Sequence, residues 1–193
     1  MTDAGAALPI VERALVEHFG SAPQRASISF VGVEPIDILR FEPIPDERAY
    51  VSLGMCRRPM TGADAAVLSA EGPRAELMVH LRDPGDEHTE LWRKLAVLAA
   101  APAVEGVVYA ADMTVELGEP LSPRSRCVGA LITGSPLPAI ATPGGPVEVL
   151  QAVPATSVEL AWARVHGTAV LRERWQRHGT DLLDLRRASV PLD

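Results

Sequence analysis

The side chains best suited to proton transfer or metal binding in this chain are its five histidines and two cysteines. The histidines form neither a His-Glu-x-x-His pattern nor a compact His/Cys spacing, which argues against a metal site. They stand at positions 18, 80, 88, 166 and 178. His80 could exchange a proton beside Glu76 or Arg82 on an exposed strand face, but an ordinary surface histidine explains the same pattern. Cys56 and Cys127 are far apart in sequence, which fits reduced, buried thiols.

Two further patterns resemble catalytic motifs only superficially. Ser135 follows an apolar segment, yet the Gly-x-Ser-x-Gly elbow is missing and Pro136 favours a loop. Gly144-Gly145 lacks the lysine and hydroxyl residue of a phosphate-binding loop, so a hairpin is favoured. The carboxylates of Asp86 and Glu87 fall at an expected helix start, where the helix dipole accounts for them. We therefore predict no catalytic residue, no metal and no cofactor.

Arg57 and Arg58 are the charge pair most suited to binding a partner. They lie at the expected exit of a strand, directly before Pro59. Two adjacent guanidinium groups could bind carboxylates of a partner protein in bidentate fashion. The alternative is an ordinary solvated loop.

Composition and charge limit the class of protein. The 193 residues are 47% hydrophobic and 22% charged, which is typical of one soluble globular domain spanning residues 1–193. The net charge of −7 disfavours nucleic-acid binding. The N-terminus lacks a signal-peptide pattern and no apolar run is long enough for a membrane span, so we expect a cytoplasmic protein. Seventeen of the eighteen basic residues are arginine, which favours a bacterial source with a GC-rich genome.

The first half of the chain predicts a helix followed by strands. Apolar residues recur at helical spacing from Leu8 to Phe19. Short apolar segments, separated by Pro35 and by the turn at residues 43–46, then predict strands at 28–33, 36–41 and 49–53. In the strand expected at 75–82, Ala75, Leu77, Val79 and Leu81 face the core and the other face is mostly polar.

The second half predicts a helix, two strands and two more helices. The first helix carries Leu91, Leu95 and Leu98 on one face and is bounded by Pro102. Residues 127–132 read as an interior strand and residues 147–153 as another. Ser157 is the expected cap of a helix that Gly167 interrupts, and a second helical piece ends near Gly179. The order of elements predicts an α+β domain with a mixed, largely antiparallel sheet covered by helices.

Several of these segments, in this order and spacing, resemble the bacterial branch of the suppressor-of-fused domain family over almost the whole chain. They include the tryptophan-bearing segment Leu91-Trp92. The others are Leu53-Gly54-Met55 with Arg58-Pro59-Met60, Ala75-Glu76-Leu77-Met78, Val153-Pro154 through Glu159-Leu160, and the ending from Asp181 to Val190.

The resemblance implies a non-enzymatic α+β domain that binds a protein. Animal members restrain transcription factors through a two-domain clamp, and this chain is too short to hold the second domain. Bacterial members resemble predicted immunity proteins that neutralise toxins of neighbouring cells. The leading hypothesis is therefore an immunity protein, whose partner would be a cognate toxin. A cytoplasmic adaptor or regulator that sequesters another protein is the alternative, and a hydrolase is the third.

Overall fold

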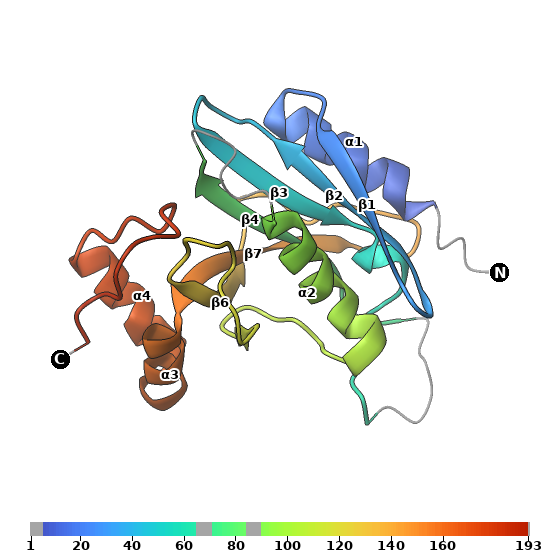
Figure 1. The fold of residues 1–193 in the computed structure, drawn as a ribbon. Coiled ribbons are helices and arrows are strands. Elements are labelled where there is room, and N and C mark those ends of the chain that lie inside the picture. The colour runs from blue at the N-terminus through green and yellow to red at the C-terminus, as the bar shows by residue number, and fades with distance from the viewer. Residues whose placement is uncertain (1–5, 65–70, 84–89, 193) are drawn as a thin grey trace.

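A single seven-stranded sheet with helices on both faces forms the framework of the protein (Figure 1). The computed structural model describes residues 6–64, 71–83 and 90–192. The helices are α1 (Ala7–Phe19), the 3-10 turn η1 (Met55–Arg57), α2 (Leu91–Glu105), α3 (Ser157–His166) and α4 (Thr168–Arg177). The strands are β1 (Gln24–Phe30), β2 (Val33–Phe41), β3 (Glu47–Leu53), β4 (Arg74–Arg82), β5 (Thr114–Glu116), β6 (Cys127–Gly134) and β7 (Val147–Thr156).

The sheet consists of two antiparallel halves joined by one parallel pair. Its strand order is β1-β2-β3-β4-β7-β6-β5. Strands β4 and β7 run parallel, with Leu77 opposite Leu150, and every other neighbouring pair is antiparallel. This confirms the predicted α+β fold with a mixed, largely antiparallel sheet covered by helices.

The two faces of the sheet are covered differently. On one face, α2 buries the largest apolar cluster, which includes Leu77, Leu95 and Ile132. On the other face, α1 covers the β2–β4 side through Val11 and Leu15. The α3–α4 pair covers the β6–β7 side of that second face in a third cluster, and in Figure 1 it lies well apart from α1.

Strand β4 is buried on both faces, which corrects the prediction of a mostly polar second face. Glu76 and Met78 are fully or almost fully buried, and His80 is only partly exposed. Of the residues expected on the polar face, Arg82 alone is exposed. The reason is topological, because β4 lies in the middle of the sheet, between β3 and β7.

The first hairpin turns three residues earlier than the sequence indicated, at residues 31–32 and not 34–35. The expected break at Pro35 lies inside β2, and the chain reverses at Val31 and Gly32, where Gly32 has a φ of 78°. Pro35 is tolerated because the β1–β2 register shifts between Ile28 and Phe30, so its missing N–H interrupts no regular pair there. Strand β1 consequently begins at Gln24, before the expected strand.

Helix α2 continues through Pro102, which was expected to bound it. The helix ends at Glu105 and is capped by Gly106, which adopts the left-handed conformation with φ 67°. A proline inside a helix leaves the carbonyl four residues earlier without its partner. Here that carbonyl belongs to Leu98, and it accepts a hydrogen bond of 2.8 Å from the Tyr109 hydroxyl. The expected acidic start at Asp86 and Glu87 lies outside the described residues.

The C-terminal helices begin at a cap one residue away from the expected one. Thr156, and not Ser157, caps α3, in a capping box with Glu159. The Thr156 hydroxyl accepts from the Glu159 N–H and the Glu159 carboxylate accepts from the Thr156 N–H. The interruption at Gly167 is confirmed, and α4 ends at Arg177.

Candidate functional site

The turn that carries Arg57 is built around the buried carboxylate of Glu76. One Glu76 oxygen accepts the N–H groups of Gly54 at 2.7 Å and of Cys56 at 3.1 Å. The other oxygen accepts from the Ser52 hydroxyl and from the Met55 N–H. Glu76 is fully buried, so the chain direction after β3 depends on these bonds.

Arg74 fixes the same turn from its carbonyl side. Its guanidinium donates to the carbonyls of Cys56 at 2.8 Å, Arg57 at 2.9 Å and Gly144 at 2.9 Å. The last of these bonds ties the turn to the β6–β7 connection. Opposite charges at Glu76 and Arg74 thus hold the two sides of one loop.

Arg57 and Arg58 differ in how freely they are presented. The Arg57 guanidinium donates to the Pro35 carbonyl and is only partly exposed. The Arg58 side chain is 72% exposed and lies 3.8 Å from a carboxylate oxygen of Glu34, itself on the surface. An exposed ion pair of this kind contributes little to stability, so Arg58 is the freer of the two to bind another molecule.

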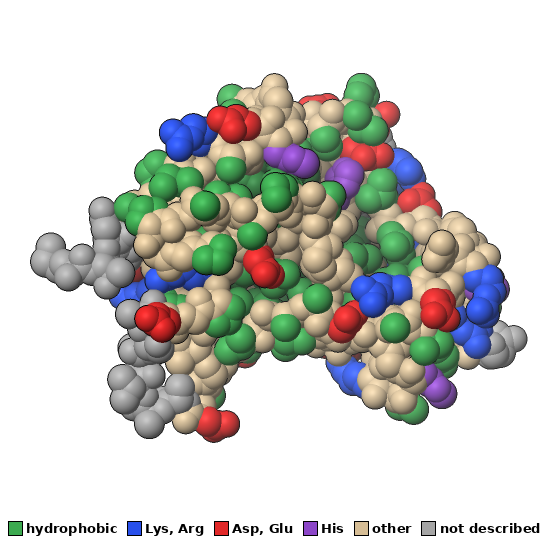
Figure 2. Space-filling view, turned by 180° about the vertical axis from the view of Figure 1, so that it is seen from behind, with side chains coloured by type: hydrophobic (Ala, Val, Ile, Leu, Met, Phe, Trp, Pro, Cys, Tyr) green, Lys and Arg blue, Asp and Glu red, His purple; other side chains and the backbone are tan. Residues whose placement is uncertain are grey.

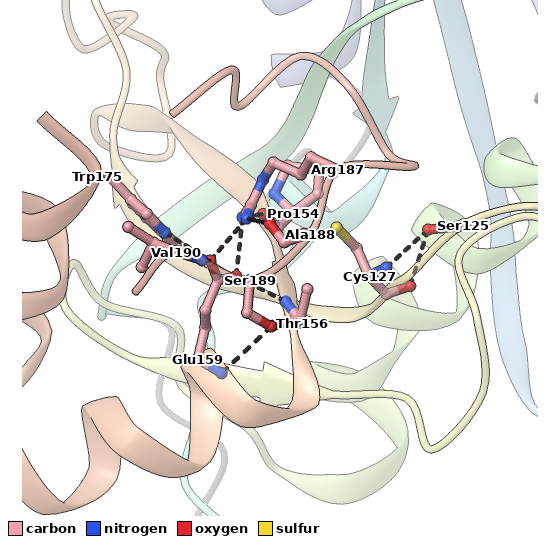
Figure 3. A network of polar contacts seen from close by, with 10 residues as sticks. All are labelled: Ser125, Cys127, Pro154, Thr156, Glu159, Trp175, Arg187, Ala188, Ser189 and Val190. Atoms are coloured by element: carbon pink, nitrogen blue, oxygen red, sulfur yellow. Dashed lines mark hydrogen bonds and ion pairs between the residues drawn. The ribbon is translucent and has the colours of Figure 1, made fainter. Parts of the chain in front are cut away.

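A second buried carboxylate, Glu159, organises the C-terminal part of the protein (Figure 3). The Arg187 guanidinium donates to both of its oxygens, at 2.6 and 2.8 Å. The Trp175 indole N–H and the Val190 N–H each donate at 3.0 Å, and the Thr156 N–H donates at 2.9 Å. Five hydrogen bonds from three segments therefore meet on one side chain.

The pKa of the Glu159 carboxyl is set by two opposing effects. Burial raises the pKa, because a charged group loses its hydration. The hydrogen bonds from Arg187, Thr156, Val190 and Trp175 lower it more in total, so the pKa lies below its ordinary value. Glu159 is therefore a carboxylate at neutral pH and has no proton to donate, which fits a structural role.

The same group of contacts fixes the C-terminal segment against the sheet. Arg187 donates to the Pro154 carbonyl at 3.0 Å, and the hydroxyls of Ser189 and Thr156 are 2.8 Å apart. The Ser125 hydroxyl bonds to the Leu185 carbonyl at 3.2 Å. These bonds join the segment after α4 to β7 and to the loop before β6.

A hollow opens on the sheet between these C-terminal elements and β4, with a volume of about 460 Å³. Its polar lining includes His80 and Gln151 on the sheet and Arg172 and Gln176 on α4. Trp175 and the segment after α4 supply apolar lining, so the Glu159 contacts position one wall. Arg172 is paired with Asp112 at 3.0 Å, and His80 Nε2 lies 2.8 Å from a Glu47 oxygen. The arginine and the histidine that line the hollow therefore each have a carboxylate beside them.

The residues considered for catalysis are placed as follows. His80 contacts Glu47 on the neighbouring strand β3. Ser135 accepts from the Leu137 N–H at 3.2 Å in the loop after β6, as a turn-forming serine does. Cys56 and Cys127 are free and buried, and burial raises the pKa of the Cys127 thiol to about 11. Among the described residues, no cluster of three His, Cys, Asp or Glu side chains could hold a metal ion. None of the described helices is both long and apolar enough to cross a membrane.

The protein is an α+β domain in which two buried carboxylates fix the chain: Glu76 fixes the turn after β3, and Glu159 fixes the C-terminal segment. Residues 32–188 match the family model of the suppressor of fused protein (SUFU). The chain therefore belongs to the suppressor of fused family. No curated protein sequence matches it.

Solved structures share this fold at low sequence identity. A suppressor of fused homologue from Neisseria gonorrhoeae FA 1090 is 20% identical, with a TM-score of 0.67, and the match covers 94% of this chain and 95% of that one. The Sufu-Fu complex structure matches with the same identity and TM-score over 94% and 91% of the two chains. Drosophila Suppressor of Fused is 19% identical with a TM-score of 0.64, over 95% of this chain and 50% of its own.

The segments that resemble the family lie around the two buried carboxylates, Glu76 and Glu159. Leu53-Gly54-Met55 and Ala75-Glu76-Leu77-Met78 meet at Glu76, whereas Val153-Pro154, Glu159-Leu160 and the ending meet at Glu159. The sequence did not reveal that Glu76 and Glu159 hold these segments together. The Thr-x-x-Glu spacing of residues 156–159 is a capping-box signal that could have identified Glu159. For Glu76, only a charge between apolar neighbours was visible.

Proposed function

We propose that the chain is a non-enzymatic protein-binding domain that acts in the bacterial cytoplasm as an immunity protein against a polymorphic toxin. The family match over residues 32–188 carries this proposal. It is supported by the use of Glu76 and Glu159, the two most buried carboxylates of the family segments, as structural anchors. The oxygens of both carboxylates accept hydrogen bonds from within the protein.

Arg57 and Arg58 are the proposed contacts for carboxylates of the partner. The turn that presents them is held by buried bonds to Glu76 and Arg74, so it loses little conformational freedom on binding. Arg58 supplies the exposed charge, and Arg57 would supply a second one if it exchanged the Pro35 carbonyl for a partner carboxylate.

Co-expression with the toxin-like product of the neighbouring gene tests this function. The wild-type chain is expected to restore growth and to co-purify with the toxin module. Changing Arg57 and Arg58 together to alanine should weaken the complex, whereas the same change at Arg13 and Arg93, two exposed arginines on other helices, should not. Absence of both rescue and complex with the wild-type chain would reject the immunity role for that toxin.

A cytoplasmic adaptor or regulator is the second candidate function. The likeness to the Sufu-Fu complex structure favours it, because that relative was solved together with a protein partner. A pull-down that recovers a housekeeping protein in place of a toxin, at stoichiometric yield, would support the adaptor. A hydrolase remains the third candidate, and turnover that is lost on replacing His80 or Ser135 would support it.

A further inference from the structure

Helix α3 is apolar on two opposite faces, although only one of them is covered by the described residues. Leu160 and Ala163 point into the third apolar cluster and are buried. On the opposite side, Val158 is 57% exposed and Val165 is 77% exposed, and Ala161 is exposed between them. Residues 158, 161, 162 and 165 follow the i, i+3, i+4, i+7 spacing of a single helix stripe. A helix apolar on both sides is normally buried on both sides.

An aromatic side chain in this stripe is held in place by its neighbours. The Trp162 ring stacks on the His166 ring with centroids 4.4 Å apart. The Arg174 guanidinium carbon lies 5.3 Å from the Trp162 ring centroid. Tryptophan and arginine that are already ordered are the residue types that most often carry binding energy at protein interfaces.

The α3–α4 segment that carries the stripe has an excess of arginine, although the protein as a whole is acidic. Residues 157–177 contain four arginines and two glutamates, and one of these glutamates, Glu159, is buried. Two of the arginines have an acidic partner on another element: Arg164 pairs with Glu116 and Arg172 with Asp112. The whole chain has a net charge of −7. At the lower right of Figure 2, where α3 and α4 lie in this view, several Lys and Arg side chains and a few Asp and Glu side chains surround hydrophobic ones.

We propose that the outer face of α3, formed by Val158, Ala161, Trp162 and Val165, binds an amphipathic helix of a partner protein whose apolar stripe is flanked by Asp or Glu. The stripe extends over two helical turns, about 10 Å, which suits side-by-side packing of a second helix. Arg174 would meet one acidic flank, and Arg164 would meet the other by exchanging its present partner, Glu116, for it. This inference rests on the proposed protein-binding function and assigns it a surface distinct from Arg57 and Arg58.

A second copy of this chain fits the surface poorly. Two-fold association through α3 would place two arginine-bearing surfaces against each other, and like charges across an interface oppose binding. The charge of the surface thus favours an acidic partner over self-association.

Two synthetic amphipathic peptides with the same leucine stripe, one flanked by Glu and the other by Lys, test the proposal on the full chain. Binding is followed by fluorescence anisotropy and by amide NMR spectra. We expect the Glu peptide to shift the amide signals of α3 and α4 and to bind at least about tenfold more tightly than the Lys peptide. V158N/V165N should weaken its binding at least about tenfold.

Helix α2 offers a matched control, because Val97 and Val104 are also exposed and have the same seven-residue spacing. V97N/V104N should leave the affinity for the Glu peptide within about twofold. The proposal is overturned if no α3 or α4 signal moves, if the Lys peptide binds as tightly, or if both double variants weaken binding equally. A concentration-dependent dimer that V158N/V165N abolishes would assign the surface to a second copy and also overturn it.

The neighbouring toxin separates this inference from the proposed function. If the wild-type chain binds the toxin and V158N/V165N binds it equally well, the α3 surface is wrong and the immunity role stands. If no toxin complex forms but the Glu peptide binds α3 as described, the immunity role fails and the surface stands.

Discussion

Replacing Glu159 by glutamine tests whether the C-terminal part of the fold depends on one buried charge. Glutamine keeps the size of the side chain but replaces one acceptor oxygen with an amide that donates. All five groups around Glu159 are donors: three meet one oxygen, from Trp175, Arg187 and Val190, and two meet the other, from Thr156 and Arg187. Only a carboxylate accepts at both positions.

The expected loss of stability follows from these contacts. In the better orientation of the glutamine, its amide faces the Thr156 N–H and one Arg187 nitrogen, so two buried donors lose their acceptor. Each such donor costs about 1–3 kcal/mol. Arg187, which is almost fully buried, also loses its counter-charge, and breaking a buried pair typically costs about 3–5 kcal/mol. We expect E159Q to lower the free energy of unfolding by about 3–5 kcal/mol at pH 7.

Guanidinium unfolding measures this loss, followed by tryptophan fluorescence and by circular dichroism so that two-state behaviour is checked. The double variant E159Q/R187M should be less damaging than the sum of the two single variants, because it removes the unpaired charge that E159Q leaves behind. Hydrogen exchange of the residue 181–192 segment should accelerate in E159Q more than exchange in β2 and β3.

An unfolding free energy of E159Q within about 1 kcal/mol of the wild type would contradict a dependence of the fold on this charge. Simple additivity of E159Q and R187M would also contradict it, because independent effects would mean that the pair does not act as one unit. A uniform rise in hydrogen exchange would show that the C-terminal segment has no separate dependence on Glu159.

Three further predictions concern acid, thiol chemistry and the second anchor. Hydrogen bonding holds the pKa of Glu159 below its ordinary value in the folded state, so the unfolded chain takes up the proton first as the pH falls. The free energy of unfolding should therefore be constant above pH of about 5 and fall below about 4.5. Urea titrations should show a shallower fall in E159Q. Burial raises the pKa of the Cys127 thiol to about 11 and also raises that of the Cys56 thiol. At pH 8 the cysteines of the native protein should therefore be alkylated at least about 100-fold more slowly than those of the denatured protein. Fast labelling of the native protein would contradict the burial of these thiols. R74M loses one hydrogen bond to a buried carbonyl, that of Cys56, and two to partly buried carbonyls, and it should cost about 2–4 kcal/mol in unfolding measurements. R58A should change stability by less than about 0.5 kcal/mol.

The sequence predicted the elements better than their ends, and the differences have local causes. The apolar spacing of residues 8–19 and the alternation at 75–82 identified α1 and β4 directly. Pro102 did not end α2, because the Tyr109 hydroxyl takes the carbonyl that the proline leaves free. Tyr109 is seven residues further along, so this rescue depends on a tertiary contact that local rules do not contain. Strand β5 is only three residues long and gave no periodic signal.

The candidate site was less predictable than the fold. Arg57 and Arg58 were recognised as a charge pair, and the structure adds that their turn is anchored by Glu76. The burial of Glu76 could not be predicted from an alternating pattern, because that pattern does not reveal whether the second face of a strand is covered. Whether the arginines bind a partner remains a prediction. The exposed stripe on α3 was visible in the sequence as Val158, Trp162 and Val165, but its exposure depends on where α3 packs.

The parallel pairing of β4 with β7 has a consequence for the synthesis of the protein. Strands β1 to β4 are antiparallel neighbours in chain order and can pair as soon as they leave the ribosome. The other edge of β4 must wait for Val147–Thr156, which follow about 65 residues later. Until then Leu77 and Met78 belong to an open edge strand, a form that favours pairing with other nascent chains. The nascent chain is therefore most prone to misassembly after β4 has been synthesised and before β7 has. Pairing of β7 with β4 ends this stage.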